Sequence, residues 1–194
     1  MKQRCSWCGS DPLYRDYHDR EWGVPVHEDQ KLFEMLILEG AQAGLSWLTI
    51  LNKRENYRQA FDLFDIVKIA RYSSDDVQRL MQNAGIVRNR LKIEAVIKNA
   101  RGAIAIQDRF GSLAAYFWNY VDHQARQNRW QRTEEIPSST AESEKMGKDL
   151  KNRGFNFVGS TICYAFMQAT GMVNDHITEC FRYQEILTFN RSQD

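Results

Sequence analysis

Residues 29–58, DQKLFEMLILEGAQAGLSWLTILNKRENYR, decide the fold of this 194-residue chain. Residues 32–38 would present apolar side chains on nearly every face of a helix, which is typical of a buried helix. Gly44 is suited to ending that helix, and Ser46 is suited to capping a second helix whose first turns are again apolar. We therefore expect two buried helices at the centre of the protein.

A single carboxylate, Glu39, lies between these two apolar runs and is flanked by the small residues Gly40 and Ala41. A buried carboxylate without a partner is costly, so such a group is usually paired, protonated or placed to bind a ligand. Two interpretations remain open at this point. Glu39 either pairs with an arginine or lysine from elsewhere in the chain, or it belongs to a binding site.

Composition favours one soluble, intracellular domain spanning residues 1–194. The hydrophobic content of 43% is sufficient for a core, and no apolar run reaches the length of a membrane span. The N-terminus has no apolar stretch resembling a signal peptide, and four cysteines without such a signal argue against a disulfide scaffold. The net charge is only +1, but residues 88–101 and 145–153 are locally basic, as in a phosphate-binding surface or an ordinary solvated helix face.

The remaining chain predicts further helices and no convincing strand, so we expect an all-α fold. Asp11 followed by Pro12 predicts a helix start, with Tyr14, Tyr17 and His18 close together on that helix. Ser74 and Ser139 are candidate N-caps, the latter in a capping box with Glu142. The segment 126–135 is expected to be a loop. The expected helices cover residues 13–19, 61–69, 75–83, 113–121, 139–151, 161–170 and 174–180.

Residues 83–90, NAGIVRNR, resemble the turn of a helix-hairpin-helix motif, which we place at about residues 75–101. One helix ends at Gly85, two β-branched residues follow, and a basic helix begins after Arg88. Backbone N–H groups of such a hairpin can hold a DNA phosphate without recognising a base. Any antiparallel helix pair can turn on a glycine, so the motif alone is compatible with an ordinary helical hairpin.

Cysteine and histidine residues at the two ends of the chain suggest a metal site. His176 and Cys180 are four residues apart, and on a helix both would point the same way. With Cys5 and His18 they make a Cys₂His₂ set suited to a closed tetrahedral zinc site, which would join residues 5–18 to residues 176–180. Cys8 is a rival ligand because Cys5 and Cys8 form a C-x-x-C pair. Separate buried thiols and surface histidines are the alternative.

Several longer motifs resemble the bacterial 3-methyladenine DNA glycosylase I family, within the helix-hairpin-helix DNA glycosylases. The motifs are DPLY (11–14), YHD (17–19), EWGVP (21–25), LEGAQAGLSW (38–47), KRENY (53–57), AGIVR (84–88), FVGSTIC (157–163) and VNDH (173–176). They occur in this order from Cys5 to about Tyr183. The tail after Tyr183 lies outside the resemblance.

The resemblance implies a helix-hairpin-helix glycosylase fold with two helical lobes, acting as a monofunctional hydrolase in base excision repair. It implies release of free 3-methyladenine from alkylated double-stranded DNA, leaving an abasic site. It also implies one structural zinc ion, a monomer, no membrane partner and a bacterial cytoplasmic location. The zinc ligands implied are Cys5, His18, His176 and Cys180, so the resemblance favours His18 over Cys8.

The same resemblance places the base pocket around Glu39, the expected catalytic residue. The implied substrate-binding residues are Trp7, Tyr14, Tyr17, Trp22 and Trp47. Gly44 and Leu45 would enter the gap left by the flipped nucleotide, and Gly85 and Arg88 would contact the DNA backbone. The wider helix-hairpin-helix glycosylases carry a catalytic aspartate after the hairpin. Here residues 113–121 contain no acid, so we expect catalysis without that carboxylate.

These residues suit the removal of a cationic base. A flipped 3-methylated adenine carries a positive charge, so aromatic faces and a carboxylate can recognise it and no protonating acid is needed. Two other functions remain possible from the residues alone. One is a non-enzymatic helix-hairpin-helix module that senses damaged DNA, which leaves Glu39 unexplained. The other is a zinc hydrolase, which would need an open metal position.

Overall fold

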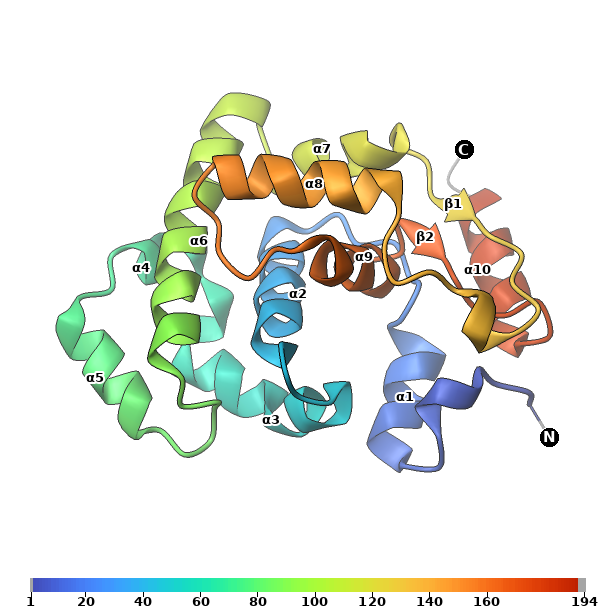
Figure 1. Ribbon diagram of the computed structural model, residues 1–194, viewed down its shortest axis with the longest axis horizontal. Helices are drawn as coiled ribbons and strands as arrows, with labels where there is room; N and C mark the ends of the chain where they lie inside the picture. Colours follow the sequence, from blue (N-terminus) through green and yellow to red (C-terminus); the bar gives the residue numbers. More distant parts are fainter. Residues whose placement is uncertain (1, 192–194) are drawn as a thin grey trace.

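The computed structural model describes residues 2–191 and is mostly helical (Figure 1). Its helices are α1 (Pro12–Arg20), α2 (Asp29–Gln42), α3 (Trp47–Ala60), α4 (Ile66–Ala70), α5 (Ser74–Gln82), α6 (Arg90–Phe110), α7 (Leu113–Trp118), α8 (Ala141–Asn152), α9 (Ser160–Ala169) and α10 (Phe181–Arg191). Short 3₁₀ turns cover Ser6–Cys8, Asp62–Phe64, Asn119–Val121 and Thr133–Glu135. Among residues 2–191, no helix combines the length and apolarity needed to cross a membrane.

Helix α2 lies at the centre of the protein, as its apolar run predicts. It contacts α3, α6, α7 and α9, and its residues from Leu32 to Ala41 are all buried. Figure 1 shows α6 along one side of α2 and α8 across the top, with α1 and α10 on the other side. At the start of α2, the Asp29 carboxylate accepts backbone hydrogen bonds from Leu113 (2.9 Å) and Ala114 (3.0 Å), which fixes the beginning of α7.

The predicted caps around the central helices are present. Asp11 accepts a hydrogen bond from the Tyr14 amide, with Pro12 as the first residue of α1. Ser46 accepts a hydrogen bond from the Thr49 amide (3.2 Å) at the start of α3. Gly44 has a φ of 79°, a left-handed conformation that glycine adopts without steric cost. The α2–α3 connection therefore follows from local sequence signals.

Other predictions of helix boundaries were wrong. Two N-caps differ by one residue, and two expected helices are interrupted or shorter. The helix expected at residues 61–69 is interrupted, because Asp62, Leu63 and Phe64 all have positive φ and Asp65 caps a new helix, α4. The helix expected at 113–121 continues beyond Trp118 only as a 3₁₀ turn. The N-caps of α5 and α8 are Ser73 and Thr140, each one residue from the predicted cap, because each forms a capping box with the residue three positions later.

The all-α prediction needs one correction. Strands β1 (Arg126–Gln127) and β2 (Val173–Asn174) form a small parallel sheet, with Arg126 opposite Val173. Residues 175–180, expected to be helical, form an irregular turn before α10. The Thr178 amide donates to the Trp130 carbonyl oxygen (2.8 Å), a partner from the 126–135 segment that a continuous helix would exclude. Strands of two residues are too short to give an alternating pattern in the sequence.

Candidate active site and metal cluster

A cleft of about 320 Å³ lies between α1, α2, α3, α9 and the segment that includes the 3₁₀ turn Thr133–Glu135. It contains all six side chains that the resemblance assigns to a base pocket, although they come from five segments: the Ser6–Cys8 turn, α1, the residues after α1, α2 and α3. The lining residues are Trp7, Tyr14, Tyr17, Trp22, Glu39, Gln42, Trp47, Thr133, Ile136, Pro137, Ala165 and Gln168.

Glu39 is the carboxylate of this cleft, and its side chain forms no ion pair with any residue that the structure describes. Only 4% of the residue is exposed, and burial raises its pKa from the ordinary 4.5 to about 8. Among the described residues, the ion pairs of α2 are made by Lys31 and Glu34. The buried Arg54 donates to Glu34 (2.7 Å) and to Glu21 (2.9 Å). The internal ion pair considered for Glu39 is therefore made by Glu34 instead.

Aromatic rings form most of the wall around Glu39. The Tyr17 and Trp47 ring centroids are 5.5 Å apart, and Trp7 lies 5.1 Å from Tyr14 and 4.8 Å from Trp22. Burial, and then the neighbouring Glu39 carboxylate, raises the pKa of Tyr17. The tyrosines therefore stay neutral, and the wall offers aromatic faces to a flat ligand. Such faces attract a cation that lies over them.

Two polar groups in the cleft wall have no partner among the described residues. The indole N–H groups of Trp7 and Trp47 are buried and donate to no other described residue. Buried donors of this kind are rare in proteins unless water or a ligand accepts from them. Together with Glu39, they give the cleft two donors and one carboxyl group available to a bound molecule.

Sequence reasoning missed Gln168, which lines the cleft from α9. Its side-chain amide donates to Asp175 (2.8 Å), and Asp175 also accepts from the hydroxyl group of Tyr164 (2.6 Å). Asp175 is fully buried, so the orientation of the Gln168 amide is well defined. The only sequence signal was a polar side chain within an apolar helix. Nothing in the sequence indicated that Thr133, Ile136 and Pro137 line the cleft, because their segment has the composition of an ordinary loop.

The loop between α2 and α3 borders the cleft. Gln42 lines the cleft, and its carbonyl oxygen accepts a hydrogen bond from the Leu45 amide (2.6 Å). The Leu45 residue is 40% exposed, and its side chain is apolar. A Cβ added to Gly44 would meet nothing within 4 Å. An exposed apolar side chain therefore stands beside the cleft that contains Glu39.

The α5–α6 connection forms the expected tight turn, at the lower left of Figure 1. A Cβ on Gly85 would lie 3.0 Å from atoms of Asn56 and Asn83, so the turn has little room for a side chain there. Four of its amides already have partners: Gly85 donates to the Asn83 side chain (2.8 Å), Ile86 to the Asn83 carbonyl oxygen (3.4 Å), Val87 to the Tyr57 hydroxyl (3.2 Å) and Asn89 to the Val87 carbonyl oxygen (2.9 Å). Arg88 is exposed beside them.

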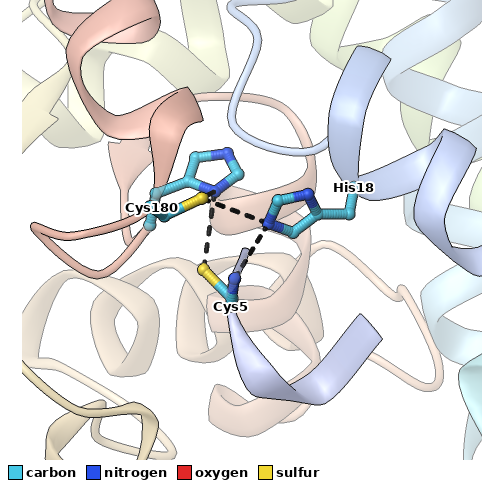
Figure 2. Close-up of side chains that lie close together, drawn as sticks. Cys5, His18 and Cys180 are labelled. Atoms are coloured by element: carbon cyan, nitrogen blue, oxygen red, sulfur yellow. Dashed lines mark hydrogen bonds between the residues drawn. The ribbon is translucent and has the colours of Figure 1, made fainter. Parts of the chain in front are cut away.

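Four predicted metal ligands converge at the junction of the chain ends. Figure 2 shows Cys5, His18 and Cys180 pointing toward one another, and the ligand atoms of these three and His176 all lie within 4.8 Å of one another. Cys180 Sγ lies 3.4 Å from His18 Nε2 and 3.6 Å from His176 Nδ1, and Cys5 Sγ lies 3.6 Å from His176 Nδ1. A tetrahedron with bonds of roughly 2.0–2.3 Å has edges of roughly 3.3–3.8 Å. The cluster could therefore hold a metal ion.

The groups behind the histidines fit the same interpretation. His18 Nδ1 lies 2.8 Å from Asp19 Oδ1, and His176 Nε2 lies 3.0 Å from the Trp22 carbonyl oxygen. Such contacts fix the ring orientation and leave the other ring nitrogen free for a metal. Cys8 is outside the cluster, and its thiol donates to the Cys5 carbonyl oxygen (3.2 Å). The structure thus groups His18, and not Cys8, with the other three residues.

Comparison with known proteins gives three consistent results. Residues 7–183 match the family model described as methyladenine glycosylase. The chain is 52% identical over 181 residues to DNA-3-methyladenine glycosylase 1 of Escherichia coli (strain K12), covering 93% of this chain and 97% of that protein.

Solved structures show the same similarity. A crystal structure of 3-methyladenine DNA glycosylase I is 55% identical, with a TM-score of 0.90, covering 92% of this chain and 98% of that one. A substituted 3-methyladenine DNA glycosylase I in complex with 3-methyladenine is 35% identical, also with a TM-score of 0.90, covering 92% of this chain and 96% of that one.

Proposed function

This chain belongs to the methyladenine glycosylase family, and from that premise we propose how its cleft acts on alkylated DNA. The protein is a DNA-3-methyladenine glycosylase, which hydrolyses the N-glycosidic bond of 3-methyladenine, releases the free base and leaves an abasic site. A non-enzymatic damage sensor is not favoured, because the similarity to named glycosylases extends over nearly the whole chain. The observation that carries the proposed mechanism is the unpaired, buried Glu39 in an aromatic cleft.

We propose that the cleft recognises the base by its shape and its positive charge. A base inside a duplex cannot be reached at its glycosidic bond, so the nucleotide must be flipped out. Tyr17 and Trp47 would offer aromatic faces to the flat cation, each worth about 0.5–2 kcal/mol. Trp7, Tyr14 and Trp22 would complete the wall. An unmethylated adenine lacks both the methyl group and the positive charge, so it gains less from this environment.

Glu39 would supply the specific polar contact. In the free enzyme, burial raises its pKa to about 8, so the carboxyl group is mostly protonated near neutral pH. A cationic base entering the cleft favours the carboxylate form and lowers that pKa again. The carboxylate can then accept hydrogen bonds from the adenine edge, and charge-assisted bonds in a dry site are strong. Binding of the cation would therefore release a proton.

The positive charge also explains why few catalytic groups are required. Methylation at N3 makes the adenine a good leaving group, so a residue that protonates it is unnecessary. The residues lining the cleft include no lysine, which supports simple hydrolysis without a Schiff-base step. Helix α7, where a downstream catalytic aspartate was considered, contributes nothing to the cleft. Glu39 is the carboxylate of the cleft, and we assign it to recognition of the cationic base.

For DNA binding, we propose separate roles for the α2–α3 loop and the α5–α6 turn. The exposed Leu45, carried by the Gly44 turn, would enter the gap left by the flipped nucleotide as an apolar wedge. The turn at Gly85, with the exposed Arg88, would hold a phosphate of the DNA backbone. We take α5 and α6 as a helix-hairpin-helix within a single glycosylase domain of two helical lobes, residues 1–194.

We propose that the cluster of Cys5, His18, His176 and Cys180 holds one zinc ion. Four protein donors leave no open coordination position, so the ion would be structural and would join the N-terminal segment to the segment before α10. It supplies no catalytic step. The protein would act as a monomer on double-stranded DNA. Its named relatives are bacterial, and we place its action in the cytoplasm, where bacterial DNA lies.

The proposed activity is tested by chromatography of the bases released from methylated duplex DNA. We expect free 3-methyladenine to appear with time, in proportion to enzyme, with the DNA strand left uncut until the abasic sites are cleaved by alkali. A protein that binds methylated DNA and releases no base would instead be a damage sensor. Strand cleavage by the protein alone would contradict the monofunctional mechanism.

A further inference from the structure

Lys92 connects the two proposed DNA-binding loops, although it lies in neither. It is the third residue of α6, directly after the α5–α6 turn, and its backbone amide donates to the capping side chain of Asn89 (3.1 Å). Its side chain extends away from this helix to the end of α2. There Nζ donates to the carbonyl oxygens of Ala41 (2.8 Å) and Ala43 (2.6 Å).

These two carbonyl groups belong to the end of the helix that carries Glu39. The last carbonyls of an α-helix have no partner within the helix and carry partial negative charge, so a lysine there is stabilising. Residues 43–46 are exposed, and the Leu45 amide is held by the Gln42 carbonyl oxygen. Lys92 therefore holds the carbonyl groups of the residues before and after Gln42. The position of Leu45 depends on these bonds.

A second lysine makes the opposite connection. Lys53, on α3, donates through Nζ to the carbonyl oxygens of Ala84 (3.2 Å) and Gly85 (3.4 Å) in the α5–α6 turn. Helix α3 begins directly after the Leu45 loop. A lysine of α3, the helix after the Leu45 loop, thus binds the α5–α6 turn, and a lysine of α6, the helix after that turn, binds the Leu45 loop. Neither loop can shift without stretching one of these contacts.

We propose that Lys92 is a positioning residue for base flipping, which holds the Leu45 loop at a set distance from the phosphate-binding turn. This inference rests on the proposed function, in which Leu45 enters the duplex. DNA held at the turn then meets the wedge at the flipped nucleotide, and a small displacement of such a group costs rate. Two of the three donors of the Lys92 ammonium group are already bound to backbone oxygens, so we assign the group to positioning and not to a phosphate contact.

The test is Lys92→Met, which keeps most of the apolar length of the side chain and removes both hydrogen bonds. We expect excision from duplex DNA to fall roughly tenfold, as when a charge-assisted bond that holds a group is lost. Excision from single-stranded DNA and binding of free 3-methyladenine should be unchanged, since neither requires a wedge. Lys92→Arg should recover part of the duplex activity. Lys98→Met, at an exposed lysine on the same helix, is the matched control.

Two measurements separate this role from others. The slope of the logarithm of duplex affinity against the logarithm of salt concentration should not change in Lys92→Met, because no phosphate contact is lost. The double variant Lys92→Met/Leu45→Ala should lose little more duplex activity than Leu45→Ala alone, because Lys92 acts through Leu45.

Several results would overturn the inference. They are normal duplex excision by Lys92→Met, an equal loss on single strands, a salt slope reduced by about one charge, or full additivity with Leu45→Ala. If Leu45→Ala itself loses no duplex preference, the proposed wedge fails and this inference fails with it. If Leu45→Ala loses more activity on duplex than on single-stranded DNA while Lys92→Met excises normally, the wedge stands and only the positioning role of Lys92 is wrong.

Discussion

Replacing Glu39 with glutamine keeps the size of the cleft side chain and removes its charge. The folded protein keeps the Glu39 proton up to a pKa of about 8, whereas the unfolded chain loses it near the ordinary 4.5. Between these values the folded state binds more protons, so rising pH favours unfolding. At pH 7 this difference lowers the free energy of unfolding by about 3 kcal/mol relative to its value well below pH 4. Glu39→Gln should remove this pH-dependent decrease in the free energy of unfolding, because glutamine does not titrate.

The same substitution should damage excision. A glutamine can still accept a hydrogen bond, but it cannot pair with the positive charge of 3-methyladenine. The charge-assisted contribution is worth about 1.5–3 kcal/mol, which corresponds to about one to two decades in rate if it is felt at the transition state. We therefore expect a variant that is more stable than the wild type near pH 7 and a poorer glycosylase.

Urea or thermal unfolding of both proteins at pH 5, 7 and 9, beside an excision assay per folded molecule, measures both effects. The stability gap between Glu39→Gln and the wild type should widen in favour of the variant from pH 5 to pH 9. Glu34→Gln is a useful contrast, because Glu34 pairs with the buried Arg54 and its loss should destabilise the fold. A destabilised Glu39→Gln protein with normal excision would refute the reasoning and make Glu39 part of the scaffold.

Three further outcomes concern the metal and the DNA. The folded protein should contain about one zinc ion, and Cys180→Ser should lose metal and stability while Cys8→Ser loses neither, as measured by metal analysis and melting. Full zinc in Cys180→Ser would contradict the ligand assignment. Leu45→Ala should lose more activity on duplex than on single-stranded DNA, and equal losses would argue against a wedge. Arg88→Ala should weaken binding similarly on all sequences and flatten its salt dependence by about one charge, so a sequence-dependent loss would contradict a phosphate contact.

Local signals were sufficient for the central helices, whereas the residues of the cleft were implied by the family resemblance. Asp11 with Pro12, the apolar run of α2, Gly44 and Ser46 each act within a few residues, so their effects can be predicted from the sequence. The burial of Glu39 also follows from its neighbours. The sequence does not predict that Glu39 lacks an ion pair. Arg54 could pair with either of two carboxylates on α2, Glu34 or Glu39, and the folded structure pairs it with Glu34.

Features set by distant contacts could not be predicted. The irregular segment 175–180 is shaped partly by the Trp130 carbonyl oxygen, and the small sheet pairs residues 47 positions apart. A helix was expected there because four-residue spacing of His176 and Cys180 suits one, yet a turn brings the same side chains together. The contacts of Lys92 with Ala41 and Ala43 likewise span about fifty residues and leave no local pattern.

The central claim is that 3-methyladenine binds in the Glu39 cleft, and the indole N–H groups provide a direct measurement. In a nuclear magnetic resonance titration with free 3-methyladenine, the indole signals of Trp7 and Trp47, whose N–H groups have no partner within the described residues, should shift together and saturate. The Trp118 signal should stay in place, because its N–H donates to the Val26 carbonyl oxygen (2.8 Å) away from the cleft. Unchanged Trp7 and Trp47 signals at saturating ligand would contradict the account.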